Sequence, residues 1–308
     1  MSVSSVRASW MLVGVTLLWG MSFSWTYAWQ EASKGQVGPL LSGLTLIGLR
    51  MPLALAVLVA WQPRAVFGIN RAEFAGGFLI GSVFFAGFAL QTWGLASTTP
   101  ALSAFFTSIC SAWVPLLSWL AFRDRPRLLT LAGLGLGLLG CAALVKGWNL
   151  SFGDWLTLGA SLLFGVQVLA LDRVGKRVDP AHLTAGFLVA TGSLSLLGAT
   201  LVAASGDGVG AWVGWVGDML AVPKLAWSVV ALAVMATAVA FQWMNSYQPL
   251  VSASRAALIY LLEAVFATLF SVMLGIDPLT GSLILGGSLI IVGNVLVELP
   301  GWLSARPT

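Results

Sequence analysis

Apolar residues occur along this chain in ten long runs that short polar segments separate. A run of about 20 apolar residues crosses the hydrocarbon core of a bilayer as an α-helix. Each run, read as far as its glycine, proline or charged breakers, therefore predicts one membrane-spanning helix. The predicted spans are residues 10–29, 39–61, 73–95, 99–121, 128–145, 154–173, 181–204, 225–245, 251–273 and 279–298. Strand-like alternation is absent, and an open sheet edge would stay unsatisfied in lipid, so the pattern predicts an all-α membrane protein.

The two parts of the chain resemble one another in sequence. Trp10–Gly20 aligns with Trp155–Gly165, and an offset of 153 residues (277 − 124 = 153) aligns Leu131–Gly140 with Ile284–Gly293, Ala104 with Ala257 and Asp124 with Asp277. Each copy holds five spans, and because five is an odd number, the second copy enters the membrane from the opposite side. We therefore expect two inverted five-helix repeats, residues 1–150 and 151–308, within one membrane unit.

The composition agrees with a chain whose solvent is the bilayer. Hydrophobic residues make up 58% and charged residues 8% of the sequence, with a mean hydropathy of +0.94, whereas soluble domains contain about 25% charged residues. The first apolar run follows Arg7 as a signal peptide would, but it is long and lacks a clear small-residue cleavage site. It is better interpreted as a retained first span.

The basic residues lie mainly in the short segments between spans, where they indicate topology rather than nucleic-acid binding. A cytoplasmic N-terminus places on the inner side Arg7, Arg64, Arg71, Arg123, Arg125, Arg127, Arg173, Lys176, Arg177 and Arg306, against Lys34, Lys146 and Lys224 outside. Because positive charge stays on the cytoplasmic side, we expect both termini in the cytoplasm and the chain in the inner (plasma) membrane.

Several segments resemble a known family. They are LLWGMSFSW at Leu17–Trp25, the pair Arg50 and Pro52, the run from Gln91 to Gly140, and its counterpart at Leu250–Leu279. In these segments the chain resembles the EamA family of the drug/metabolite transporter superfamily, and its general look is similar to the YddG-type exporters of aromatic and other amino acids. The loop after the fourth span departs from the family, because Arg123-Asp124-Arg125 stands where many relatives carry a glutamate between small residues.

A transporter needs a water-accessible cavity near the bilayer midplane, so polar and aromatic residues inside spans are the candidates for substrate binding. They are Trp19, Ser22, Gln91, Thr107, Ser111, Trp113, Gln167, Gln242, Trp243, Asn245, Tyr260 and Glu263. The resemblance implies the same region, because in this family the first, third, fourth, sixth, eighth and ninth spans line the cavity. We expect Gln91, Gln242, Trp243 and Tyr260 to converge there. Each candidate also has a structural alternative, since serine and threonine often bond to carbonyls of their own helix.

Glu263 is the carboxylate that lies well inside a span, and an intramembrane acid is a functional hypothesis by default. It would bind a substrate ammonium group or carry a proton. The alternative is an ion pair that holds two helices together, with Arg50 as the obvious partner. The sequence leaves both interpretations open.

Motifs for other activities are missing or misplaced. Gly135–Gly140 matches the GxGxxG spacing of dinucleotide sites, but it lies inside an apolar span with no preceding strand. Together with Gly133, these glycines indicate a small-residue face for helix packing. The sequence contains no P-loop, HExxH or Ser-His-Asp set, so we expect no enzyme, cofactor or metal site.

The resulting hypothesis is a secondary transporter that exports amino acids, including aromatic ones, or related small metabolites by alternating access. The alternatives are export of nucleobases, cationic drugs or sugar derivatives and, more remotely, a membrane-embedded enzyme or signalling protein.

Overall fold

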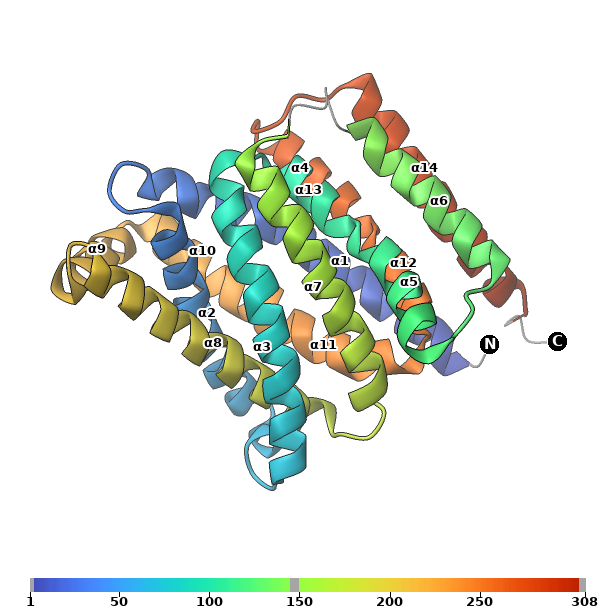
Figure 1. The fold of residues 1–308 in the computed structure, drawn as a ribbon, viewed down its shortest axis with the longest axis horizontal. Coiled ribbons are helices and arrows are strands. Elements are labelled where there is room, and N and C mark those ends of the chain that lie inside the picture. The colour runs from blue at the N-terminus through green and yellow to red at the C-terminus, as the bar shows by residue number, and fades with distance from the viewer. Residues whose placement is uncertain (1–2, 145–149, 305–308) are drawn as a thin grey trace.

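The computed structural model describes residues 3–144 and 150–304, and every regular element within them is a helix (Figure 1). The first half contains α1 (Val3–Ser33), α2 (Pro39–Trp61), η1 (Pro63–Ala65), α3 (Arg71–Gly94), η2 (Leu95–Ser97), α4 (Pro100–Ser108), α5 (Cys110–Phe122) and α6 (Leu128–Leu144). The second contains α7 (Phe152–Val174), α8 (Pro180–Ser205), α9 (Val209–Ala221), α10 (Pro223–Ala233), η3 (Val234–Val239), α11 (Ala240–Tyr247), η4 (Gln248–Leu250), α12 (Ala253–Tyr260), α13 (Leu262–Met273) and α14 (Gly281–Ser304). Lys146 and Arg306, two residues of the charge count, lie outside the described residues.

Eight helical segments of the described chain are long and apolar enough to cross a membrane, and α6 and α14 contribute two shorter apolar helices. The all-α membrane fold is therefore confirmed. Prolines begin α2, α4, α8 and α10, where a missing N–H costs nothing in the first turn. Capping boxes begin α3 at Asn70 and α7 at Ser151.

Four local features differ from the expected ten uninterrupted spans. The fourth span breaks at Ile109 between α4 and α5, and the ninth breaks at Leu261 between α12 and α13. The eighth contains a π-helical turn, η3. The segment expected as a loop after residue 204 forms α9, an additional helix of 13 residues. Its buried side packs through Trp215 and Met219. With 13 residues, α9 is too short to cross the hydrocarbon core of a bilayer.

Contacts between helices of the two repeats occur at equivalent positions. A Cβ atom built on Gly20 of α1 would lie 2.5 Å from the Cβ atom of Phe266 in α13, and one on Gly165 of α7 would lie 2.9 Å from that of Trp113 in α5. Gly20 is the sequence mate of Gly165, and Trp113 is the mate of Phe266 (266 − 113 = 153). Each repeat thus packs its first helix against the fourth span of the other. Two inverted five-helix repeats are therefore confirmed.

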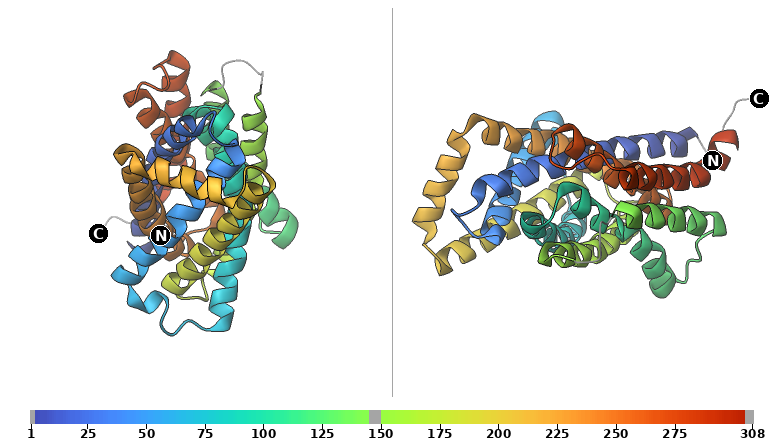
Figure 2. Two further views of the ribbon diagram at one scale, coloured as in Figure 1. Left: turned by 90° about the vertical axis from the view of Figure 1, so that its left-hand side faces the viewer. Right: turned by 90° about the horizontal axis from the view of Figure 1, so that it is seen from above.

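The last helix of each repeat, α6 and α14, forms a pair at one side of the bundle (Figures 1 and 2). A Cβ atom on Gly140 would lie 2.5 Å from the carbonyl oxygen of Gly286, and one on Gly293 would lie 2.5 Å from that of Gly133. These glycines are therefore the small-residue face that lets two backbones touch. Gly135, by contrast, faces open space.

We expect Gly293→Ala to lower stability, because the added methyl group meets backbone that cannot rotate away. Overpacking of this kind costs about 1–3 kcal/mol. Gly135→Ala is the matched control, since nothing lies within 4 Å of its Cβ position. Thermal unfolding of the detergent-solubilised protein should show a lower midpoint for Gly293→Ala alone. Equal midpoints for the two variants would contradict the close helix contact.

Candidate functional site

A small cavity of about 60 Å³ lies at the centre of the bundle, between the two repeats. It is lined by Trp19, Ser22, Phe23, Arg50, Phe84, Phe88, Gln91, Thr107, Cys110, Phe164, Gln167, Val168, Ala236, Phe241, Tyr260 and Glu263. The lining comes from the first, second, third, fourth, sixth, eighth and ninth spans. Seven of the twelve candidate residues are among it: Trp19, Ser22, Gln91, Thr107, Gln167, Tyr260 and Glu263.

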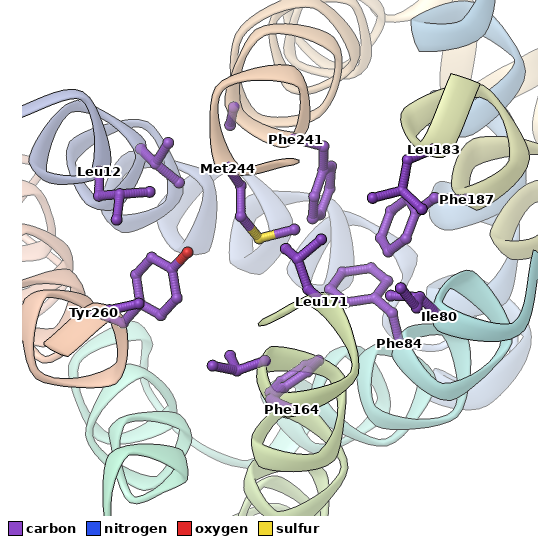
Figure 3. Close-up of a cluster of buried hydrophobic side chains, with 14 of the residues drawn as sticks. Leu12, Ile80, Phe84, Phe164, Leu171, Leu183, Phe187, Phe241, Met244 and Tyr260 are labelled. Carbon is purple, nitrogen blue, oxygen red and sulfur yellow. The ribbon is translucent and has the colours of Figure 1, made fainter. Parts of the chain in front are cut away.

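Aromatic rings form much of the cavity wall. Phe84 of α3 lies 5.5 Å from Phe164 of α7 and 5.0 Å from Phe241 of α11, measured between ring centroids. Trp19 of α1 lies 5.6 Å from Tyr260 of α12. Figure 3 shows four of these rings, all except Trp19, converging from different helices. The tilted and edge-on arrangements are those that aromatic pairs prefer, so this wall offers stacking surface to a planar substrate group.

Arg50, which was not among the residues predicted to bind substrate, is part of this lining. Its side chain is 2% exposed, and its Nε donates to the Thr237 hydroxyl oxygen at 2.8 Å. Its Nη2 donates to the carbonyl oxygen of Ala236 at 3.4 Å, and the guanidinium lies 5.1 Å from the centroid of the Phe88 ring. Both hydrogen bonds end on the π-helical turn η3, where a widened turn accommodates an extra residue.

Glu263 lies in the first turn of α13, directly after the break in the ninth span, and is 8% exposed. Its carboxylate forms no ion pair and no hydrogen bond with the side chains that the structure describes. The ion pair between Arg50 and Glu263 is therefore absent from the described residues. The repeat mate of Glu263 is Cys110 (263 − 153 = 110), which lines the same cavity at the equivalent break after Ile109.

Polar contacts hold several lining residues in place. Gln91 of α3 donates through Nε2 to the Thr107 hydroxyl of α4 at 2.6 Å. Nearer the end of the bundle where α1 begins, the Tyr260 hydroxyl donates to Gln248 Oε1 at 2.8 Å, and Gln248 Nε2 donates to the carbonyl oxygen of Val168 at 2.9 Å. We call these three residues, Val168, Gln248 and Tyr260, the latch. Thr107 and Tyr260 are repeat mates (260 − 153 = 107), so a glutamine contacts the same repeat position in each half.

The serine and threonine hydroxyls follow the structural alternative. Ser22 donates to the carbonyl oxygen of Trp19, Thr107 to that of Ser103 and Ser111 to that of Ser108, all three or four residues back along the same chain. Thr107 still accepts from Gln91, and Ser22 still reaches the cavity surface. Ser111 does not line the cavity.

Gln242, Trp243 and Asn245 do not reach the cavity, so the expected convergence of Gln91, Gln242, Trp243 and Tyr260 is wrong for its two eighth-span members. The extra residue in η3 rotates the helix that follows, which turns Phe241 inward in place of its neighbours. Asn245 Nδ2 instead donates to the Thr184 hydroxyl of α8 at 2.9 Å. Trp113 likewise packs away from the cavity, with its Nε1 donating to Ser161 at 3.1 Å.

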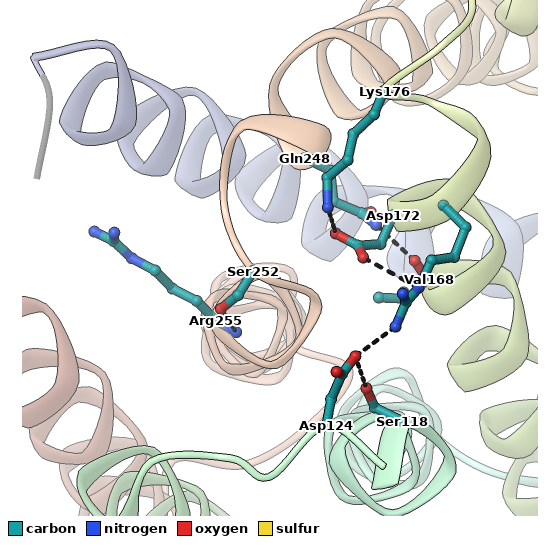
Figure 4. A network of polar contacts seen from close by, with 9 residues as sticks. Ser118, Asp124, Val168, Asp172, Lys176, Gln248, Ser252 and Arg255 are labelled. Carbon is teal, nitrogen blue, oxygen red and sulfur yellow. Dashed lines mark hydrogen bonds and ion pairs between the residues drawn. The ribbon is translucent and has the colours of Figure 1, made fainter. Parts of the chain in front are cut away.

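A wide vestibule opens at the end of the bundle where α1 begins, and its lining includes Ser118, Asp124, Arg125, Arg127, Asp172, Arg173, Lys176, Pro249, Ser252 and Arg255. An ionic network crosses it (Figure 4). Arg173 joins Asp124 at 2.5 Å and Asp172 at 3.7 Å, and Lys176 joins Asp172 at 2.9 Å. The latch joins the two spaces, because Tyr260 and Val168 line the cavity and Pro249, next to Gln248, lines the vestibule.

Comparison with known proteins agrees with this architecture. Residues 11–146 and 151–299 each match the EamA-like transporter family. An uncharacterized transporter of Archaeoglobus fulgidus is 28% identical over 238 residues, which cover 74% of this chain and 70% of the relative. A protein of known crystal structure is similar in fold, with a TM-score of 0.71 at 22% identity over 98% of this chain and 99% of that one. The two segments that match the family model make this chain a member of the EamA-like transporter family, a multi-pass membrane transporter and not an enzyme.

Proposed function

We propose that this protein exports amino acids, including aromatic ones, across the inner membrane. One observation carries the proposal: the lining of one central cavity combines aromatic rings with both a guanidinium and a carboxylate. An amino acid presents the matching groups, because it has an ammonium, a carboxylate and, in aromatic members, a ring that stacks on Phe84, Phe164 or Phe241. The resemblance to YddG-type exporters supports the same substrate class.

The mechanism we propose is alternating access around the central cavity. Each repeat contributes a polar contact at the cavity, the latch towards the vestibule in one repeat and the Gln91–Thr107 pair in the other. In repeat-built transporters, one bundle rocks against the other around a fixed midplane site. Opening the latch would connect the cavity to the vestibule. The excess of basic residues at this end supports a cytoplasmic vestibule, and with it cytoplasmic termini.

Transport into proteoliposomes tests the proposed function. Radiolabelled phenylalanine, leucine, adenine and a cationic dye would be offered to vesicles with and without a pH gradient, next to protein-free vesicles. We expect saturable phenylalanine uptake that unlabelled amino acids inhibit. Uptake of adenine or the dye without any amino-acid uptake would replace this proposal with the nucleobase or drug alternative.

A further inference from the structure

Two buried, opposite charges face the same cavity without neutralising one another. Among the side chains that the structure describes, none of the ion pairs includes Arg50 or Glu263. The two hydrogen bonds of Arg50 to η3 occupy two of its five N–H groups. The guanidinium therefore keeps donors for another acceptor, and the Glu263 carboxylate keeps all of its acceptor sites.

The two groups occupy different walls of the cavity. Arg50 projects from α2 and is held by η3 and the ring of Phe88 in α3. Glu263 projects from α13, which packs on α1 and α4. The cavity between them is lined by aromatic rings and by polar side chains such as Gln91 and Gln167, whose hydrogen bonds go to residues other than Arg50 and Glu263. A ligand that compensates both charges must therefore carry an anionic and a cationic group at separate positions.

Burial makes each charge costly unless a counter-charge is present, because the desolvation penalty is several kcal/mol per ion. A monovalent cation would compensate Glu263 and repel Arg50, and a neutral base would compensate neither. A zwitterion compensates both at once and adds no net charge to the site. We infer that Arg50 binds the carboxylate and Glu263 binds the ammonium group of a zwitterionic substrate, and that this pair sets specificity. The inference rests on the proposed function and adds which residue binds each charged group of the substrate.

Analogues of one substrate separate the two contacts. Phenylalanine carries both charges, phenethylamine only the ammonium and 3-phenylpropionate only the carboxylate, while the ring is constant. In the unmodified protein, we expect each one-charge analogue to inhibit phenylalanine uptake at least about tenfold more weakly than unlabelled phenylalanine does, because a charge-assisted bond is lost. If both analogues inhibit as well as phenylalanine, the inference is wrong although amino-acid transport stands. If no amino acid is taken up or inhibits, the proposed function itself fails.

Variants assign each charge to its residue. Analogue binding to Arg50→Gln and Glu263→Gln would be measured by ligand-induced thermal shift, which does not require turnover. In Arg50→Gln we expect phenethylamine and phenylalanine to bind about equally, while 3-phenylpropionate stays weak. Glu263→Gln should show the reverse. Arg50→Lys, which keeps the charge, should retain the preference for phenylalanine and serves if Arg50→Gln does not fold. An unchanged preference in both glutamine variants would overturn the assignment.

Discussion

Replacing Glu263 with glutamine is expected to reduce transport by about ten- to a hundredfold while the protein remains folded and inserted in the membrane. Glutamine keeps the shape of the side chain but removes the charge that would bind an ammonium group or carry a proton, and a bond to a charged group contributes about 1.5–3 kcal/mol. Thermal stability should not fall. The described structure gives this carboxylate no cationic partner, so its neutralisation strands no buried charge.

Transport rates and unfolding midpoints would be measured for Glu263→Gln, Arg50→Gln and the double variant. Asp218→Asn is the matched control, because it makes the same chemical change on the exposed face of α9. A structural ion pair would give a different pattern, in which Glu263→Gln lowers the midpoint and the double variant partly restores it. Full transport activity at unchanged stability would exclude both roles. Loss of coupling to a pH gradient, with substrate binding retained, would assign Glu263 to proton transfer.

The spans could be predicted from sequence because one physical requirement, an apolar run long enough for the bilayer, determines them. The second span was expected at residues 39–61 and is observed at Pro39–Trp61. The breaks at Ile109 and Leu261 and the turn η3 carry no such signal, because their residues are as apolar as their neighbours. One extra residue in η3 was enough to change which side of the eighth span faces the cavity.

Polarity and composition alone could not identify all the residues that line the cavity. Polarity inside a span predicts that a side chain avoids lipid, but Gln242 and Asn245 achieve this by contacting other helices. Phe84, Phe88, Phe164 and Phe241 could not be separated from lipid-facing phenylalanines by composition. A usable signal does exist for α3, because Phe84, Phe88 and Gln91 are spaced by four and three residues and so share one helix face. Arg50 also carried a signal, as a charge inside a span.

The latch is expected to control access between the vestibule and the cavity. Gln248 is fully buried, and its amide group joins Tyr260 to Val168. Gln248→Leu removes both hydrogen bonds and leaves the buried Tyr260 hydroxyl without its acceptor, at about 1–3 kcal/mol, whereas the Val168 carbonyl oxygen keeps its bond within α7. This cost falls only on the conformation in which the latch is closed. The population should therefore shift towards conformations that open the cavity to the vestibule.

Cys110 reports this shift, because it lines the cavity and the chain has 2 cysteines, so that Cys141→Ala leaves it as the single thiol. We expect Gln248→Leu to raise the rate at which a water-soluble maleimide labels Cys110 from the vestibule side by about tenfold, since about 1.4 kcal/mol changes an equilibrium tenfold. Tyr260→Phe, which breaks one bond of the two, should have a smaller effect. Gln91→Leu is the matched control, because it makes the same substitution and breaks the contact to Thr107, the repeat mate of Tyr260. If Gln91→Leu raised labelling from the vestibule side as much as Gln248→Leu, the latch would not be the barrier between the cavity and the vestibule.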